Sequence, residues 1–331
     1  MIKRDQLKRY SIMIGRMRLV EVTLGRINLA QISSAQIRSA IGGLGLIFLL
    51  LVMSVPARGE HPIDVQRANA NGQHIDALAR YSRIPKKKLN GDAAFAAGKS
   101  AWALSLSDKA QEELARAAEY SQKDPEKLTQ INFLRAIVDF QDARFQESLV
   151  RAQSAIDTVA DGSALKARIL LLMGQTYLIL HKDSHAEQRM SEALKYADPT
   201  DRAELYFARG EARFQLGKFD EAREDFEKIS LKSERLPEAI RYLARIGMEL
   251  KRYKEAQFWL HKGRREFPEA FLDSWVDYAM GTSAIKSGDS KTARDVVKRA
   301  REQYPPSDPW FTLLEAQAEE FEWRASMGEA L

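Results

Sequence analysis

The chain has 331 residues, of which 45% are hydrophobic and 29% are charged, and it holds only 18 glycines and 10 prolines. This composition is typical of a folded protein rich in helix formers, and it excludes a largely disordered or low-complexity chain. The absence of cysteine excludes disulfides, thiolate metal sites, a cysteine nucleophile and a lipid-modified cysteine.

The net charge of +5 comes from the N-terminal segment. Residues 1–38 hold eight basic and two acidic residues, whereas residues 39–331 hold 43 basic and 44 acidic residues. A nucleic-acid-binding domain normally carries its positive charge on the folded body. We therefore expect no nucleic-acid partner.

Residues 40–57, AIGGLGLIFLLLVMSVPA, form an apolar segment with no charge between Arg38 and Arg58. As a helix, residues 40–55 would span roughly 24 Å, which is short of a hydrocarbon core of about 30 Å. The segment 39–57 is therefore either a signal peptide, cleaved near residues 55–57, or a single transmembrane helix. A buried helix of a cytosolic protein is the remaining alternative, and the true start is Met1, Met13 or Met17.

The charge around this segment predicts its orientation. Residues 1–38 are basic, so the positive-inside bias places this N-terminal segment in the cytoplasm and the C-terminal body across the membrane. We expect a bacterial protein of the inner membrane or periplasm, with the body on the periplasmic side. Residues 58–90 are predicted to be a linker and partly helical lead-in, in which Lys86–Lys88 is either a solvated charge run or a contact with anionic lipid headgroups.

A spacing of small and large residues recurs through residues 91–306. In YFARGEARFQLGKFDEAREDF, residues 206–226, Gly217, Phe219, Ala222 and Phe226 follow Gly210 at offsets of 7, 9, 12 and 16 residues. Similar offsets start from six anchors: Gly98, Ala136, Gly174, Gly210, Ala244 and Gly281. The spacing of the anchors, 34 to 38 residues, predicts a repeat of one structural unit.

This pattern resembles the tetratricopeptide repeat family, whose unit of about 34 residues is a pair of antiparallel helices. The match is best at residues 203–236, acceptable at 167–202 and 274–306, and weakest at 91–128 and 129–166. The resemblance implies an all-α, right-handed superhelical solenoid of about six helix pairs. Residues 307–331 are expected to form a capping helix, which Asp308 and Pro309 start.

Motifs for chemistry are absent from the sequence. We find no nucleophile elbow, phosphate-binding loop, dinucleotide loop or zinc-protease motif. His181 and His185 have the i, i+4 spacing of metal ligands, but the repeat frame places them across a turn. We therefore predict no catalytic, cofactor or metal site, and a protein that is not an enzyme.

The resemblance also implies that the first helix of each pair lines a groove that binds a protein partner. The predicted groove residues are Phe95, Trp102, Phe133, Phe140, Gln175, Phe207, Phe214, Arg241, Arg245 and Tyr278. Such an apolar row favours an amphipathic helix or an extended peptide as the partner. We expect Phe207 to be exposed enough that Phe207→Glu leaves the melting temperature nearly unchanged. The alternative is that these residues are buried between units or covered by the lead-in.

These features predict a non-enzymatic scaffold or adaptor in a bacterial envelope assembly, of unknown oligomeric state. A periplasmic holdase-type chaperone for secreted or outer-membrane clients is the alternative. A cytosolic adaptor remains the third interpretation if residues 40–57 stay in the cytoplasm.

Overall fold

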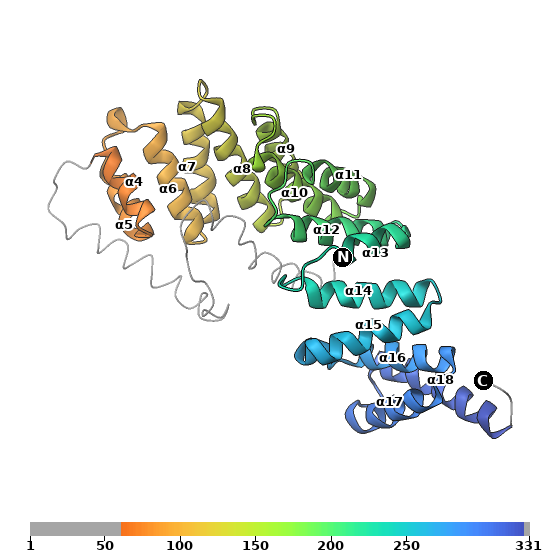
Figure 1. Ribbon diagram of the computed structural model, residues 1–331. Coiled ribbons are helices and arrows are strands. Elements are labelled where there is room, and N and C mark those ends of the chain that lie inside the picture. Colours follow the sequence, from red (N-terminus) through yellow and green to blue (C-terminus); the bar gives the residue numbers. More distant parts are fainter. Residues whose placement is uncertain (1–60, 328–331) are drawn as a thin grey trace. The chain divides into compact units, whose positions relative to one another are not determined.

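The computed structural model describes residues 61–327, and within this range every regular element is a helix (Figure 1). The predicted cytoplasmic segment 1–38 and the predicted signal peptide or transmembrane helix 39–57 lie outside the described residues. None of the helices within 61–327 combines the length and apolar character that crossing a membrane requires. The chain divides into two compact units, which meet in sequence between Leu180 and His181.

The first unit is a series of helix pairs that pack on one another in chain order. Its helices are α4 (Pro62–Ala70), α5 (His74–Arg83), α6 (Gly91–Ala103), α7 (Ser107–Tyr120), α8 (Pro125–Gln141), α9 (Phe145–Ile156) and α10 (Ala164–Ile179), with a 3-10 turn at Lys86–Lys88. The predicted lead-in thus contains a complete helix pair, α4 and α5, which packs against α6.

The second unit continues the same arrangement. Its helices are α11 (Asp183–Ala193), α12 (Arg202–Gln215), α13 (Phe219–Glu227), α14 (Leu236–Glu249), α15 (Tyr253–Glu266), α16 (Ser274–Ser287), α17 (Ser290–Gln303) and α18 (Pro309–Ser326), with a 3-10 turn at Pro268–Phe271. Helices α12 to α17 form three consecutive pairs, and α18 packs against α16 and α17.

A residue with left-handed backbone geometry follows the first helix of each pair. These residues have φ between 54° and 78° and are Gly72, Ser105, Ala143, His181, Gly217, Lys251 and Gly288. Each of the last six lies seven residues after one of the six anchors found in the sequence. Gly72 extends this frame by one unit, with the fully buried Val65 in the anchor position.

Small residues allow the two helices of a pair to cross closely. In the pairs that lie within one unit, the second helix carries alanine or serine twelve residues after the anchor, and these side chains are at most 1% exposed: Ala77, Ala110, Ser148, Ala222, Ala256 and Ala293. At Gly210, an added Cβ would lie 2.8 Å from the ring of Phe226. A side chain larger than glycine there would displace that ring, which is itself 1% exposed.

Buried carboxylates hold the helices together through arginines. Asp225 on α13 is fully buried, and Arg209 on α12 donates to both of its oxygens, at 2.8 and 2.6 Å. Arg213 on the same helix donates to Asp225 Oδ2 at 2.8 Å. Because a buried carboxylate is stable only when it is paired and hydrogen-bonded, these contacts fix the crossing of α12 and α13.

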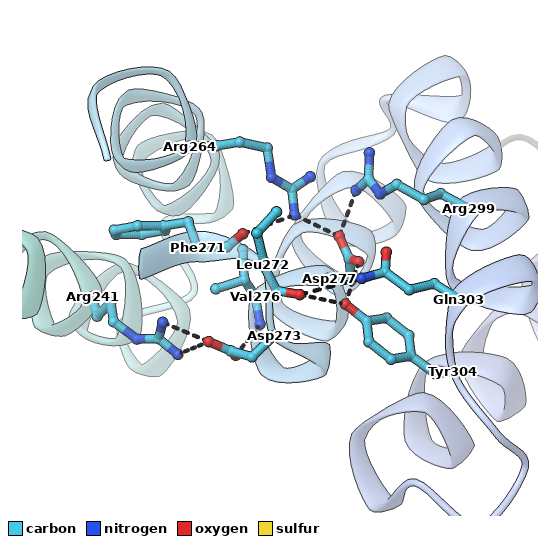
Figure 2. Close-up of polar contacts among 10 residues, drawn as sticks. All are labelled: Arg241, Arg264, Phe271, Leu272, Asp273, Val276, Asp277, Arg299, Gln303 and Tyr304. Carbon is cyan, nitrogen blue, oxygen red and sulfur yellow. Dashed lines mark hydrogen bonds and ion pairs between the residues drawn. The ribbon is translucent and has the colours of Figure 1, made fainter. Parts of the chain in front are cut away.

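A similar cluster surrounds Asp277 on α16, which is 1% exposed (Figure 2). Arg264 on α15 donates to Asp277 Oδ1 at 2.6 Å, and Arg299 on α17 donates to the same oxygen. The hydroxyl of Tyr304 donates to the other oxygen at 2.9 Å. Although burial opposes ionisation, hydrogen bonds from Arg299 and Arg264 lower the pKa of Asp277, so its charge persists at neutral pH.

Helix α18 closes the second unit with a mixed outer face. Leu314 and Phe321 are buried against the preceding helices, whereas Leu313 and Trp323 are 48% and 60% exposed. The predicted capping helix therefore packs as expected on one side. Its solvent side is less polar than the glutamates in its sequence led us to expect, because Leu313 and Trp323 are exposed there.

The turn residues generate a stability prediction. A non-glycine residue in the left-handed region costs about 1 kcal/mol relative to glycine, because its Cβ approaches the following carbonyl. Ala143→Gly and Lys251→Gly are each expected to stabilise the protein by about 0.5–1 kcal/mol, measured by chemical denaturation. Gly217→Ala, at the equivalent position, should destabilise it by a similar amount.

The matched control is Gln188→Gly at an exposed position of α11, where glycine should destabilise the helix by about 1 kcal/mol. If Lys251→Gly lowered the free energy of unfolding, as this control should, the left-handed turn would not be present in solution.

Candidate partner-binding surface

Three of the predicted groove residues belong to the core. Phe140, Phe207 and Phe214 are only 2%, 4% and 8% exposed. Phe207 packs edge-on against Phe226 and Tyr242, with ring centroids 5.7 and 5.9 Å apart. The expected exposure of these three residues is therefore wrong.

The physical reason is that the next helix pair covers the first helix of the preceding one. A glutamate at position 207 would place a carboxylate among these rings, at a cost of several kcal/mol. The nearest cation, Arg235, already pairs with Glu204 and Glu238. We therefore withdraw the expectation that Phe207→Glu spares the melting temperature.

The predicted residues of the first unit lie mostly within its packing. Phe95, Trp102 and Phe133 are half-buried against the core, and Gln175 is 2% exposed. The Trp102 indole N–H donates to Gln141 Oε1 at 2.7 Å. In α6, the Lys99 ammonium lies 4.8 Å from the centre of the Phe95 ring. These contacts leave little of the predicted apolar row on the surface of this unit.

The predicted residues of the second unit are more accessible. Arg245 is exposed, and Arg241 and Tyr278 are half-buried. Arg241 makes two hydrogen bonds to Asp273, at 2.7 and 2.6 Å, and its guanidinium lies 5.0 Å from the Trp275 ring. Its charge is therefore already satisfied within the unit.

Arg245 is held differently. Its guanidinium carbon lies 4.7 Å from the Phe214 ring centre and 5.4 Å from the Tyr242 ring centre. Within the described part of the chain it forms no ion pair. Two aromatic rings thus fix an exposed cation that lacks a counter-ion.

Two further residues on this surface, Glu211 and Trp310, are not among the predicted groove residues. Glu211, one residue after the Gly210 anchor, accepts a hydrogen bond from the Tyr242 hydroxyl at 2.8 Å. The ring of Tyr278 lies 5.1 Å from that of Trp310, which is 40% exposed. We use the name helix-A surface for Glu211, Tyr242, Arg245, Trp275, Tyr278 and Trp310, which lie on α12, α14, α16 and α18. The shared repeat position of Glu211 and Arg245 was the signal in the sequence that could have revealed Glu211.

The Glu211 carboxyl is an unusual group on this surface. Burial raises its pKa to about 7, although the Tyr242 hydrogen bond and nearby Arg235 act in the opposite direction. Glu211 is half-buried. Both Glu211 and Arg245 contact Tyr242, Glu211 through the hydroxyl and Arg245 through the face of the ring. The charge of the helix-A surface therefore changes close to neutral pH.

Metal ligands do not gather in residues 61–327, where no group of three or more histidine, aspartate or glutamate side chains could hold an ion. His181 occupies the left-handed turn, at φ 54°, and His185 is exposed in the first turn of α11.

Comparison with known families identifies one repeat directly. A model of the tetratricopeptide repeat matches residues 203–236, the unit that fits the pattern best in the sequence. No curated protein matches the chain significantly in sequence.

Solved structures extend the match to most of the chain. A TPR repeat-containing protein from Cytophaga hutchinsonii aligns with a TM-score of 0.61 and 13% identity, over 75% of this chain and 97% of that one. YrrB, a TPR protein with an unusual peptide-binding site, aligns with a TM-score of 0.52 and 16% identity, over 63% and 99% of the two chains. PilW, a type IV pilus biogenesis factor, aligns with a TM-score of 0.50 and 15% identity, over 67% and 96%. The predicted all-helical, tetratricopeptide-like solenoid is confirmed.

The raised pKa of Glu211 predicts how stability depends on pH. The unfolded carboxyl titrates near 4.5 and the folded one near 7, so between these values the folded state binds more protons. Stability should therefore fall as pH rises from about 4.5 to 7 and then level off. Glu211→Gln removes this titration. The variant should be more stable than the wild type at pH 8, by up to about 3 kcal/mol, and should gain nothing at pH 4.5.

Urea denaturation at pH 4.5, 6 and 8 measures this difference. The control is Glu249→Gln, which changes an exposed carboxylate on α14. A gain for Glu211→Gln that is the same at all three pH values would contradict the raised pKa.

Proposed function

We propose that this tetratricopeptide-like solenoid is a non-enzymatic scaffold that binds a protein segment on the helix-A surface of its second unit. The observation that carries the proposal is Arg245. Its guanidinium is exposed, is stacked on Phe214 and Tyr242, and has no ion pair within residues 61–327. A side chain already fixed in one geometry loses little conformational freedom when it binds.

The residues around Arg245 indicate the kind of partner. Trp275, Tyr278 and Trp310 offer aromatic surface, and tryptophan, tyrosine and arginine are the residues that most often dominate binding energy at protein interfaces. An amphipathic helix or extended peptide could place apolar side chains against these rings and an acidic or carbonyl group at Arg245. The structural similarity to YrrB, a TPR protein with an unusual peptide-binding site, supports this choice of partner.

We further propose that the scaffold works in a bacterial envelope assembly, in the inner membrane or periplasm. Two observations support this location. The sequence holds a basic stretch followed by the apolar segment 40–57, and PilW, which has the same fold, is a pilus biogenesis factor. A holdase-type chaperone is the alternative function, and the binding experiment below separates the two.

Photo-cross-linking in cells tests the scaffold. Trp310 is replaced by a photo-reactive aromatic amino acid, and Val150 on α9, which is 66% exposed, serves as the control position. We expect one discrete adduct from position 310 and none from 150. Arg245→Gln should reduce its yield several-fold, whereas Lys195→Gln, an equal charge change at another exposed site, should not.

The other outcomes are equally informative. A ladder of many adducts from position 310 would replace the scaffold with the holdase. An absence of adducts from 310 would remove the helix-A surface as the binding site.

Reporter fusions test the location. Alkaline phosphatase fused after residue 331 is active only when it is exported, so we expect an active fusion whose activity disappears when residues 40–57 are deleted. An inactive phosphatase fusion, together with a fluorescent green fluorescent protein fusion at the same site, would place the body in the cytoplasm and overturn the envelope proposal.

A further inference from the structure

The second helices of two consecutive pairs, α15 and α17, both pack against α16 in the second unit, and side chains connect them. Arg264 on α15 and Arg299 on α17 converge on the same oxygen of Asp277 (Figure 2). Closer to the other end, the Gln257 side chain on α15 donates to Asp289, the residue that caps α17, at 3.3 Å. These contacts hold the two helices next to each other near both of their ends.

Exposed side chains on this surface are mostly basic and surround one exposed aromatic ring. On α15, Lys254, Phe258 and His261 follow one another at i, i+4 and i+7, so they lie on the same helix face. Phe258 is 59% exposed, and its ring centre lies 5.1 Å from that of Trp259. On α17, the exposed side chains include Lys291, Arg294 and Lys298. We name these six residues, Lys254, Phe258, His261, Lys291, Arg294 and Lys298, the outer basic face.

Four cations of this face have no acidic partner in the part of the chain that the structure describes. Lys254, Lys291, Arg294 and Lys298 form no ion pair with any residue in the range 61–327. Most arginines of the same unit, by contrast, are paired, such as Arg209 with Asp225 and Arg235 with Glu204.

The acidic residues nearby leave the balance positive. On α15, Glu255 faces Arg223 at 3.8 Å and Glu266 pairs with Arg265 at 3.1 Å. Three further carboxylates stand against the four unpaired cations: Asp295 and Glu302, which are exposed on α17, and the half-buried cap residue Asp289, which interacts with His261. A surface with this excess of positive charge attracts an anionic partner.

We propose that the outer basic face docks on a bilayer surface rich in anionic phospholipid. Unpaired lysines and arginines on two adjacent helices can pair with several lipid phosphates at once, and each cation near such a surface adds to the attraction. Phe258 stands among these cations, where an aromatic ring can enter the boundary between headgroups and acyl chains. A face of this kind needs no pocket, because the lipid surface adapts to it.

This surface is separate from the helix-A surface and does not rest on the proposed scaffold function. The full chain also carries the apolar segment 40–57, which can bind lipid by itself. The experiment must therefore report on the outer basic face locally and not on membrane association of the whole chain.

A single fluorescent label provides this local report, because the chain has no cysteine. His261→Cys in the full-length protein carries a nitrobenzoxadiazole group, which keeps Phe258 and all the lysines in place. Leu231→Cys, at a position that is 73% exposed between α13 and α14, is the control. Vesicles contain either phosphatidylcholine alone or phosphatidylcholine with phosphatidylglycerol.

We expect a blue shift and an intensity increase at position 261 with phosphatidylglycerol vesicles, and no change with phosphatidylcholine vesicles or at position 231. High salt should reverse the shift, since the attraction is electrostatic. Lys291→Gln together with Lys298→Gln should weaken the response about 25-fold, at roughly fivefold per lysine. Lys195→Gln together with Lys232→Gln, an equal charge change at exposed sites elsewhere, should leave it unchanged.

Phe258→Ala should weaken the response further at constant charge, because the ring no longer enters the interface. Equal responses at positions 261 and 231, a response that does not require phosphatidylglycerol, or a double lysine variant that behaves like the wild type would each overturn the proposal. A response to duplex DNA but not to vesicles would also overturn it, because the face would then bind a different polyanion.

Discussion

Close crossing of two helices at small side chains is the constraint on which the rest of this structure depends. At the anchor and twelve residues later, glycine, alanine or serine allows the backbones to approach, as at Gly210 and Ala222. The close approach leaves room beside the crossing that only large rings such as Phe226 fill. It also forces the chain to reverse within a few residues, which explains why the turn is left-handed even where lysine or alanine occupies it.

The same packing decides which side chains remain for function. Because each pair is covered by the next, aromatic residues on the first helices, such as Phe140 and Phe207, are largely buried in the core. The accessible side chains of the second unit include Arg245 and Trp310 on the helix-A surface, and the lysines and Phe258 of the outer basic face. These two surfaces differ in chemistry, since the first combines aromatic rings with one fixed cation and the second combines several unpaired cations with one ring. A protein with both could hold a partner while it lies against an acidic surface.

The sequence predicted the fold well because the repeat is a local property. The small residues and the turn position recur at fixed offsets, and a helix pair needs no distant partner to define them. The first pair was missed because Val65 stands where the other units have a small residue, although Gly72, Ala77 and Tyr81 keep the frame. Exposure was predicted poorly because it depends on the neighbouring unit. Phe207 is covered by Tyr242, a residue 35 positions later, and no spacing within one unit reveals that contact.

Asp277 makes the boundaries of cooperative unfolding differ from those of the repeats. This one buried carboxylate is bound by α15, by α17 and by Tyr304 beyond α17, while it belongs to α16. Loss of any of these elements removes a hydrogen-bond donor from this buried carboxylate and weakens the compensation of its charge. We therefore expect the last three helices before α18 to open together, across a repeat boundary. The cluster around Asp225 crosses a boundary as well, because Arg209 and Arg213 also donate to Ser191 and Glu187 on α11. We therefore expect the unit of local unfolding in this chain to differ from the unit of sequence repetition.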